Sequence, residues 1–170
     1  MIKKMRKMVA LVAVVAALLS YSAVSVSAAV NYTVTANLYV PKENNGILGV
    51  DAYLTSAAVP PLFPASSNAT ITKHDDDTYT LSVPIVNNTF ALIDLGTPQA
   101  GSGISNIVES RNTGTYGSNT NGRITNLTMT IEEGATSVSF TGSHEYSSYF
   151  FSPGDKYFNL RLNVDWSNVP

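Results

Sequence analysis

The chain contains no cysteine, one tryptophan and only two histidines among its 170 residues. Without disulfides the fold must rely on an ordinary hydrophobic core, which a chain of this length can bury. His144 begins the segment His-Glu-Tyr-Ser-Ser, which lacks the second histidine of the zinc-protease motif. No Gly-x-Ser-x-Gly sequence marks a nucleophilic serine. We therefore expect no enzyme activity, no catalytic residues and no metal site.

Charge and hydropathy separate a leader from the rest of the chain. Residues 1–7 are basic, residues 8–19 are apolar, and Val26 to Ala28 are small. This order is that of a secretory signal peptide, so we expect cleavage after Ala28 and one exported domain over residues 29–170. Retention of the apolar segment as a membrane anchor is the alternative, although the run is short for a span. The expected location is secreted or at the cell surface.

Basic residues are scarce once the leader is set aside. Residues 29–170 hold 6 basic and 12 acidic side chains, a net charge of −6. Nucleic acids and anionic membranes bind proteins through basic surfaces. Neither is therefore expected as a partner.

Apolar residues recur with a period of two through most of the chain. The pattern runs from Tyr32 to Val40, from Tyr79 to Ile85 and from Phe158 to Trp166, and it is typical of strands. Turn-forming residues lie between the strands, as at His74–Asp77. About eight short strands with little helix predict an all-β fold, specifically an immunoglobulin-like antiparallel β-sandwich.

Three segments depart from this pattern. Residues 47–58 are expected to form a short helix or an irregular lip. Residues 59–64 contain three prolines and cannot form a central strand. Residues 96–122 are rich in Gly, Ser, Asn and Thr, with apolar residues for one short strand, which predicts a functional or mobile loop.

Half of the sixteen aromatic residues lie between Phe140 and Trp166. Strand alternation assigns those of the return strand to the core. The alternation gives no core position to Tyr146, Tyr149 and one of Phe150 and Phe151. Because exposed aromatic clusters usually pack or bind something, this hairpin is the predicted functional segment.

The order of segments resembles the NEAT (near iron transporter) domain, a haem-binding immunoglobulin-like module of cell-surface proteins. The resemblance rests on residues 31–54, on residues 77–94 and on the last hairpin, residues 137–165. It implies haem between the lip and the last hairpin, with iron ligated by a Tyr of the last strand that is hydrogen-bonded by a second Tyr four residues later. That pair is absent, because Arg161 stands four residues after Tyr157.

The resemblance places the candidate ligand site between the lip and the aromatic hairpin. His144 is the alternative iron ligand, because it shares the hairpin with Tyr146, whereas Met129 is expected in the core. The candidate ligand-binding residues are Leu48, Val50, Tyr53, His144, Tyr146, Tyr149, Phe150, Phe151 and Tyr157.

These observations predict an exported, non-enzymatic binding module of NEAT-like type. Its expected ligand is haem, another flat aromatic molecule, an extracellular polypeptide or a glycan that stacks on the tyrosines. The alternative is a structural subunit of a surface fibre or layer, which self-associates through β-edges and the aromatic hairpin.

Overall fold

The computed structural model describes residues 29–44 and 49–170. The predicted signal peptide and Leu48 of the predicted lip lie outside these residues. The described part of the chain is free of helix, so it offers none that is long and apolar enough to cross a membrane. Its strands are β1 (Val30–Val40), β2 (Ala52–Tyr53), β3 (Ala69–Lys73), β4 (Tyr79–Pro84), β5 (Phe90–Asp94), β6 (Thr97–Pro98), β7 (Ile104–Arg111), β8 (Ile124–Ile131), β9 (Ser137–Ser147) and β10 (Gly154–Asp165).

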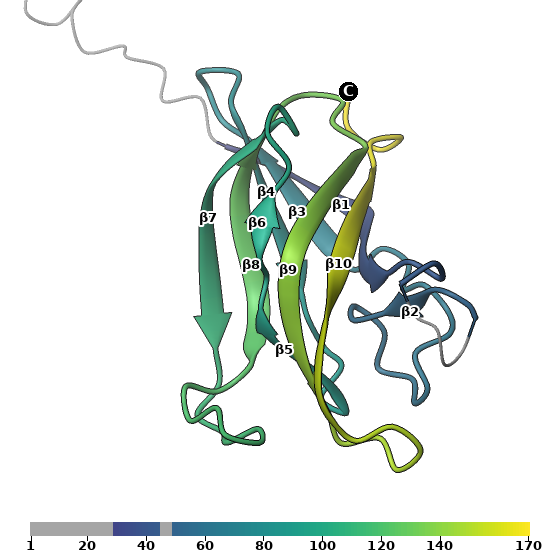
Figure 1. Ribbon diagram of the computed structural model, residues 1–170. Helices are drawn as coiled ribbons and strands as arrows, with labels where there is room; N and C mark the ends of the chain where they lie inside the picture. The colour runs from purple at the N-terminus through teal and green to yellow at the C-terminus, as the bar shows by residue number, and fades with distance from the viewer. Residues whose placement is uncertain (1–28, 45–48) are drawn as a thin grey trace, which may run out of the picture.

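All strand pairings are antiparallel, and they join the strands into one curled sheet (Figure 1). The strand order is β5-β9-β10-β1-β3-β4-β8-β7, with β2 added to β1 and β6 added to β9. Strand β1 connects the two halves of the sheet, because Val30–Val34 pair with β3 and Thr35–Tyr39 pair with β10. The all-β prediction is confirmed, with ten strands rather than about eight. The immunoglobulin-like sandwich stays a prediction, since the hydrogen-bonded strands form a single continuous sheet.

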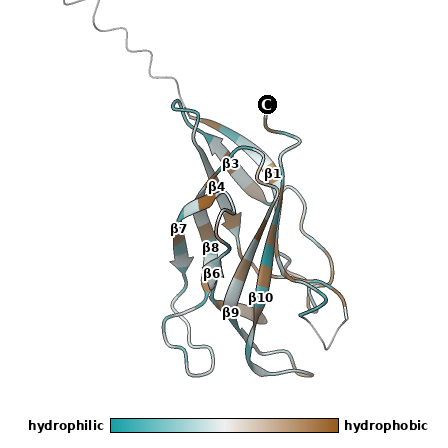
Figure 2. Cartoon of the chain, turned by 45° about the horizontal axis from the view of Figure 1, so that its top comes forward, coloured by the Kyte–Doolittle hydropathy of each residue, from teal (hydrophilic) through white to brown (hydrophobic). Residues whose placement is uncertain are grey.

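The core lies inside the curl and follows the alternation of the sequence. Hydrophobic and hydrophilic residues alternate along the strands (Figure 2), and one residue in two is buried in β4, β8 and the second half of β10. Burial of these apolar side chains is the main stabilising contribution. Met129 is 1% exposed, which confirms its predicted place in the core. Phe158 and Trp166 are half-buried against the core, and the Trp166 Nε1 donates a hydrogen bond to the Ala135 carbonyl.

The polar segment of residues 96–122 holds more structure than a single short strand. It contains β6, β7 and a hydrogen-bonded loop of residues 112–122. In that loop the Asn112 side chain donates to the Tyr116 hydroxyl and accepts from the Arg123 amide. Gly122 has φ +73°, and a Cβ there would overlap the Asn112 carbonyl. The polar composition therefore reflects loop hydrogen bonding and close backbone packing.

The lip is irregular rather than helical over its described residues. Ala52 and Tyr53 pair with Val40 and Tyr39, and the Leu54 amide donates to the Leu38 carbonyl. The Tyr53 amide donates to the Pro61 carbonyl, and residues 54–55 form a turn closed by the Ser56 amide, so over residues 49–58 the irregular lip is confirmed and the helix alternative is wrong. The proline segment of residues 59–64 contains no strand, as the sequence predicts.

Candidate functional site

The hairpin of β9 and β10 ends in a six-residue tip, residues 148–153. One backbone hydrogen bond ties the tip to the β4–β5 turn, and another closes a turn within the tip. The Ser148 amide donates to the Thr89 carbonyl over 2.8 Å, and the Ser152 amide donates to the Tyr149 carbonyl over 2.9 Å. Gly154, the first residue of β10, has φ +99°, a backbone conformation that glycine adopts more readily than other residues. These contacts give the tip a defined shape.

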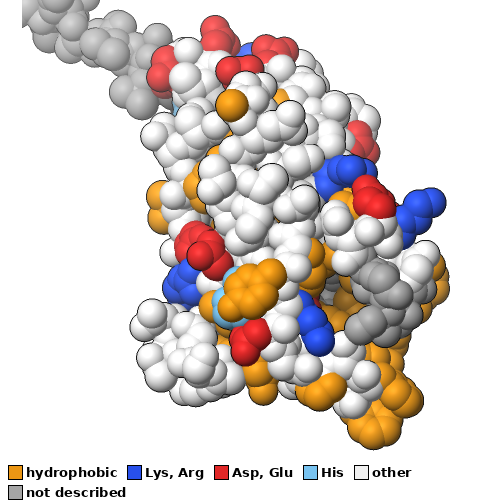
Figure 3. All heavy atoms as spheres, viewed as in Figure 1, with side chains coloured by type: hydrophobic (Ala, Val, Ile, Leu, Met, Phe, Trp, Pro, Cys, Tyr) orange, Lys and Arg blue, Asp and Glu red, His pale blue; other side chains and the backbone are white. Residues whose placement is uncertain are grey.

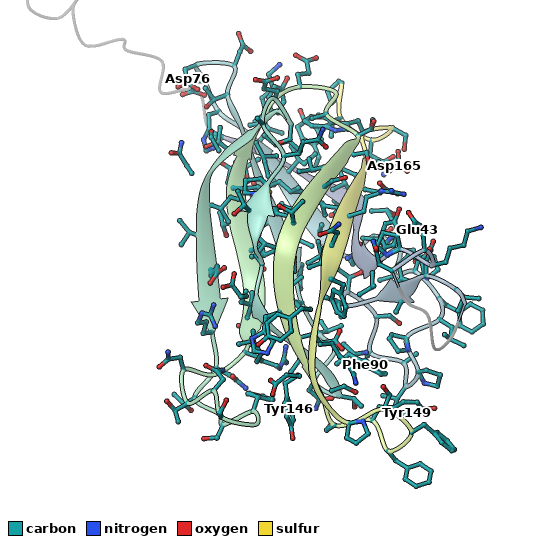
Figure 4. The ribbon with its side chains drawn as sticks, viewed as in Figure 1. Glu43, Asp76, Phe90, Tyr146, Tyr149 and Asp165 are labelled. Atoms are coloured by element: carbon teal, nitrogen blue, oxygen red, sulfur yellow. The ribbon has the colours of Figure 1, made fainter. Side chains whose placement is uncertain are left out.

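Aromatic rings form a chain from the core to the end of the tip. The ring of Tyr149 lies 5.4 Å from that of Phe90, which is only 8% exposed (Figure 4). Tyr149 meets Phe151 edge-on at 5.7 Å, and Phe151 lies 4.3 Å from Phe150. Phe150 is 80% exposed and Phe151 is 73% exposed. Tyr149 therefore anchors the tip, while the two phenylalanines project into solvent.

The side chain of Asn87 connects the end of the lip to the β4–β5 turn. It is 1% exposed, and its Nδ2 donates to the carbonyls of Ser56 and Ala58. Its Oδ1 accepts from the amides of Thr89 and Phe90. This amide thereby holds residues 56–58, just before the proline segment, against the β4–β5 turn, and the Thr89 carbonyl of that turn accepts the hydrogen bond from Ser148.

We call the surface made by residues 57–64, 86–89 and 148–153 the loop pole. Hydrophobic side chains gather at the corresponding lower right corner of the molecule in Figure 3. Its exposed large apolar side chains are Val59, Phe63, Val86, Phe150 and Phe151. Phe63 is 72% exposed, comparable with the phenylalanines of the tip.

Charge is distributed unevenly between the two ends of the curled sheet. No charged residue and no histidine occur in residues 52–72, 78–93 or 146–154, which include the whole loop pole. Acidic side chains gather at the other end, seen at the top of Figures 3 and 4. These belong to turns between strands, such as Asp75–Asp77 and Glu132–Glu133. A cavity of about 550 Å³ opens there beside Asp77 and Ile104, lined by none of the predicted site residues.

His144 and Tyr157 form a separate pair on the outer face of the hairpin. The two residues are cross-strand partners, and their rings stack with centroids 4.6 Å apart and planes 11° from parallel. The His144 Nε2 lies 2.8 Å from the Asp155 Oδ1, and Tyr157 is 72% exposed. Tyr146 lies next to this pair along β9 but packs edge-on against Tyr116.

On the inner face of the same hairpin, Glu145 is 3% exposed and stands opposite Lys156 in the ladder. Burial raises the pKa of the Glu145 carboxyl to about 8, against the opposing effect of Lys156. The carboxyl is therefore mostly protonated at neutral pH. Burial of a neutral acid costs less than burial of an ion.

The lip residues lie in a different ring cluster from the hairpin. The Tyr53 ring is 5.2 Å from that of Tyr39, and the Tyr53 hydroxyl donates to Asp51 over 3.4 Å. Partial burial, followed by the charge of Asp51, raises the pKa of Tyr53. Val50 is exposed, and Leu48 lies outside the described residues. Among the ring contacts of the described residues, none joins Tyr53 to the hairpin aromatics.

The sequence-predicted site therefore divides into parts. The structure brings together Tyr149, Phe150 and Phe151, and it separately pairs His144 with Tyr157. Sequence reasoning missed Phe63, Val59 and the buried Asn87. A run of 21 residues without charge, residues 52–72, was the available signal for the first two. In comparisons with known proteins, the chain matches no family model, no curated protein and no solved structure.

Proposed function

We propose that the protein is an exported, non-enzymatic binding module that contacts its ligand through the loop pole. The observation that carries this proposal is the exposure of Phe63, Phe150 and Phe151, between 72% and 80%, on loops outside the strands, together with the hydrophobic side chains gathered at the lower right corner of Figure 3. Leaving such rings in water is costly, and clustered exposed apolar side chains mark interaction sites. Export is supported by the leader pattern of residues 1–28.

The construction of the loop pole suits binding. Aromatic side chains offer a large contact area and lose few rotamers when they bind. The contact between Tyr149 and Phe90 fixes the base of the tip, and Asn87 fixes the adjoining segments. Preorganisation of this kind lowers the entropy lost on association.

Haem receives no support from the contacts of the described residues. The Nε2 of His144 is bonded to Asp155, its ring is stacked on Tyr157, and Tyr53 belongs to another cluster. Among the described residues, Tyr53 and the pair of His144 and Tyr157 belong to different ring clusters, whereas the NEAT resemblance implies one site between lip and hairpin. A haemin titration tests the prediction separately: a Soret shift lost in Tyr157→Ala or His144→Ala would establish haem ligation, and an unchanged spectrum would rule it out.

One observation favours the structural alternative, assembly through a sheet edge. Strand β7 ends the order of the described strands, and its Val108 is 61% exposed. A register shift between Ser105 and Val108 and the ion pair of Glu109 with Arg111 interrupt this edge, and such features oppose edge pairing. Concentration-dependent polymers in size-exclusion chromatography, abolished by a charge at Val108, would support assembly.

Binding to the producing cells tests the proposed function. The purified protein, fluorescently labelled, is incubated with these cells, and the bound fraction is compared with that of Phe150→Ser/Phe151→Ser. The matched control is Val108→Ser, which removes an exposed apolar side chain far from the loop pole. We expect the double variant to lose at least roughly tenfold in affinity and the control to bind like wild type. Equal binding by all three proteins would contradict the proposed surface.

A further inference from the structure

The shape and charge of the loop pole narrow the class of its ligand. The phenylalanines project outward and are at least 72% exposed, so the surface is convex at its most apolar points. A convex apolar surface needs a partner that is either preshaped to receive it or deformable. The interfacial region of a lipid bilayer is deformable and accepts Phe and Tyr side chains without a preformed pocket.

The absence of charge at the loop pole is a second argument for lipid. Charged side chains are the most costly groups to move into a bilayer, and residues 57–64, 86–89 and 148–153 contain none. Lys156 lies at the base of the tip, where its Nζ is 3.4 Å from the Pro153 carbonyl, and Arg123 donates to the Ile85 carbonyl beside residues 86–89. A lysine at this position can keep its ammonium group at the headgroup level while the tip lies deeper.

Backbone hydrogen bonds within the protein satisfy several of the amides at the loop pole, though not those of the three phenylalanines. Polar backbone groups without partners are costly in lipid. Here the Ser148 and Ser152 amides donate within the protein, and the Tyr149 amide donates to the Ser147 Oγ. The amide of Leu62 donates to the Pro60 carbonyl. Four prolines in the three segments have no amide proton to satisfy, namely Pro60, Pro61, Pro64 and Pro153.

We propose that the loop pole inserts into the interface of an electrically neutral lipid bilayer, with Phe63, Phe150 and Phe151 entering the apolar side. The acidic turns at the other end of the sheet then face away from the membrane. Because residues 29–170 have a net charge of −6, attraction to anionic lipid contributes nothing to this binding. The interaction is therefore hydrophobic and insensitive to salt. This inference rests on the proposed function, because it names the ligand class of the same surface.

Flotation with phosphatidylcholine vesicles tests the inference. We expect the purified protein to float with the vesicles equally at 0.1 M and 1 M NaCl. Phe150→Ser, Phe151→Ser and Phe63→Ser are each expected to weaken partitioning by roughly tenfold, whereas Val108→Ser leaves it unchanged. Thermal unfolding of each variant confirms that it is folded. A folded Phe150→Ser/Phe151→Ser protein that floats like wild type would overturn the inference.

The outcomes separate the lipid inference from the proposed function. Loop-pole-dependent binding to cells without flotation would overturn the lipid inference and leave the proposed function, with a polypeptide or glycan ligand. Flotation that requires phosphatidylglycerol in the vesicles and is lost in 1 M NaCl would also overturn the lipid inference, because such binding is electrostatic. Absence of both cell binding and flotation would overturn both proposals.

Discussion

The ring of Tyr149 packs on the ring of Phe90, 5.4 Å away and tilted by 40°, and this contact attaches the exposed hairpin tip to the core. Phe90 begins β5, an outer strand of the sheet, and is only 8% exposed. A contact between residues 59 positions apart thus connects the candidate binding surface to the interior of the fold. Substitution of Tyr149 should therefore lower both the stability of the protein and its binding. Substitution of Phe150 and Phe151 should lower binding alone.

Replacement of Tyr149 by alanine is expected to lower both stability and binding. Loss of the ring removes the contacts with Phe90 and Phe151 and opens a cavity at the base of the tip. We expect the free energy of unfolding to fall by about 1–3 kcal/mol, measured by urea denaturation, and cell binding to fall with it. Tyr149→Phe keeps the ring contacts and serves as the control. Wild-type stability in Tyr149→Ala would show that the tip is not anchored by this residue.

Replacement of the exposed phenylalanines is expected to separate binding from stability. The side chains of Phe150 and Phe151 contact mainly each other and Tyr149, and both are largely in water. Phe150→Ser/Phe151→Ser should therefore change the free energy of unfolding by less than about 1 kcal/mol. Binding should nevertheless be lost. If the double variant is strongly destabilised in urea, these rings stabilise the fold, which would contradict the prediction.

The adjacent pair Asn87 and Asn88 offers a matched test of the connection between the segments. Asn87 is buried and takes part in four side-chain hydrogen bonds, whereas Asn88 is exposed. Asn87→Ala leaves two carbonyls and two amides without these partners, and we expect a loss of about 2–4 kcal/mol. Asn88→Ala should change stability by less than about 0.5 kcal/mol. Equal urea midpoints for the two variants would refute the role of Asn87.

Burial of Glu145 predicts a specific dependence of stability on pH. The pKa of this carboxyl is about 8 in the folded protein, against an ordinary value of 4.5. Below pH 4.5 the group is protonated in both states. Between pH 4.5 and 8 the unfolded chain has lost the proton and the folded protein retains it, so unfolding releases a proton and stability falls as pH rises.

Glu145→Gln cannot ionise and should escape this loss. The stability of the variant relative to wild type is expected to increase by on the order of 1 kcal/mol per pH unit through that interval and then to level off. Urea denaturation of both proteins at pH 5, 6, 7 and 8 measures the difference. A difference that does not change with pH would mean that the carboxyl is already ionised in the folded state.

The strands could be predicted from the sequence because their pattern is local. Leu160, Leu162 and Val164 alternate with polar residues, and burial of one face of the sheet requires this alternation whatever the neighbouring strands are. Within β9 the alternation shifts at Gly142, where φ is +70° and the ladder with β10 is irregular between Phe158 and Leu160. An inserted bulge of this kind reverses which residues face inward, and the sequence gives little sign of it.

The candidate site was only partly predictable, because it depends on contacts between distant segments. Alternation ends with β9 at Ser147, so the sequence could not show that Tyr149 turns to the core while Tyr146 lies on the outer face beside Tyr116. From the sequence alone, Asn87 is indistinguishable from an ordinary turn residue. Its structural role arises from carbonyls 29 and 31 residues away.

The central claim, that the loop pole is the surface that meets the ligand, can be tested by labelling the two ends of the molecule. Because the chain has no cysteine, Ser152→Cys places one environment-sensitive dye at the tip while all of its rings are retained. Glu133→Cys places the same dye in an acidic turn at the other end. On addition of the producing cells, we predict a blue-shifted, brighter emission from the label at residue 152 and no change from the label at residue 133. A shift at residue 133 alone, or equal shifts at both positions, would contradict the claim.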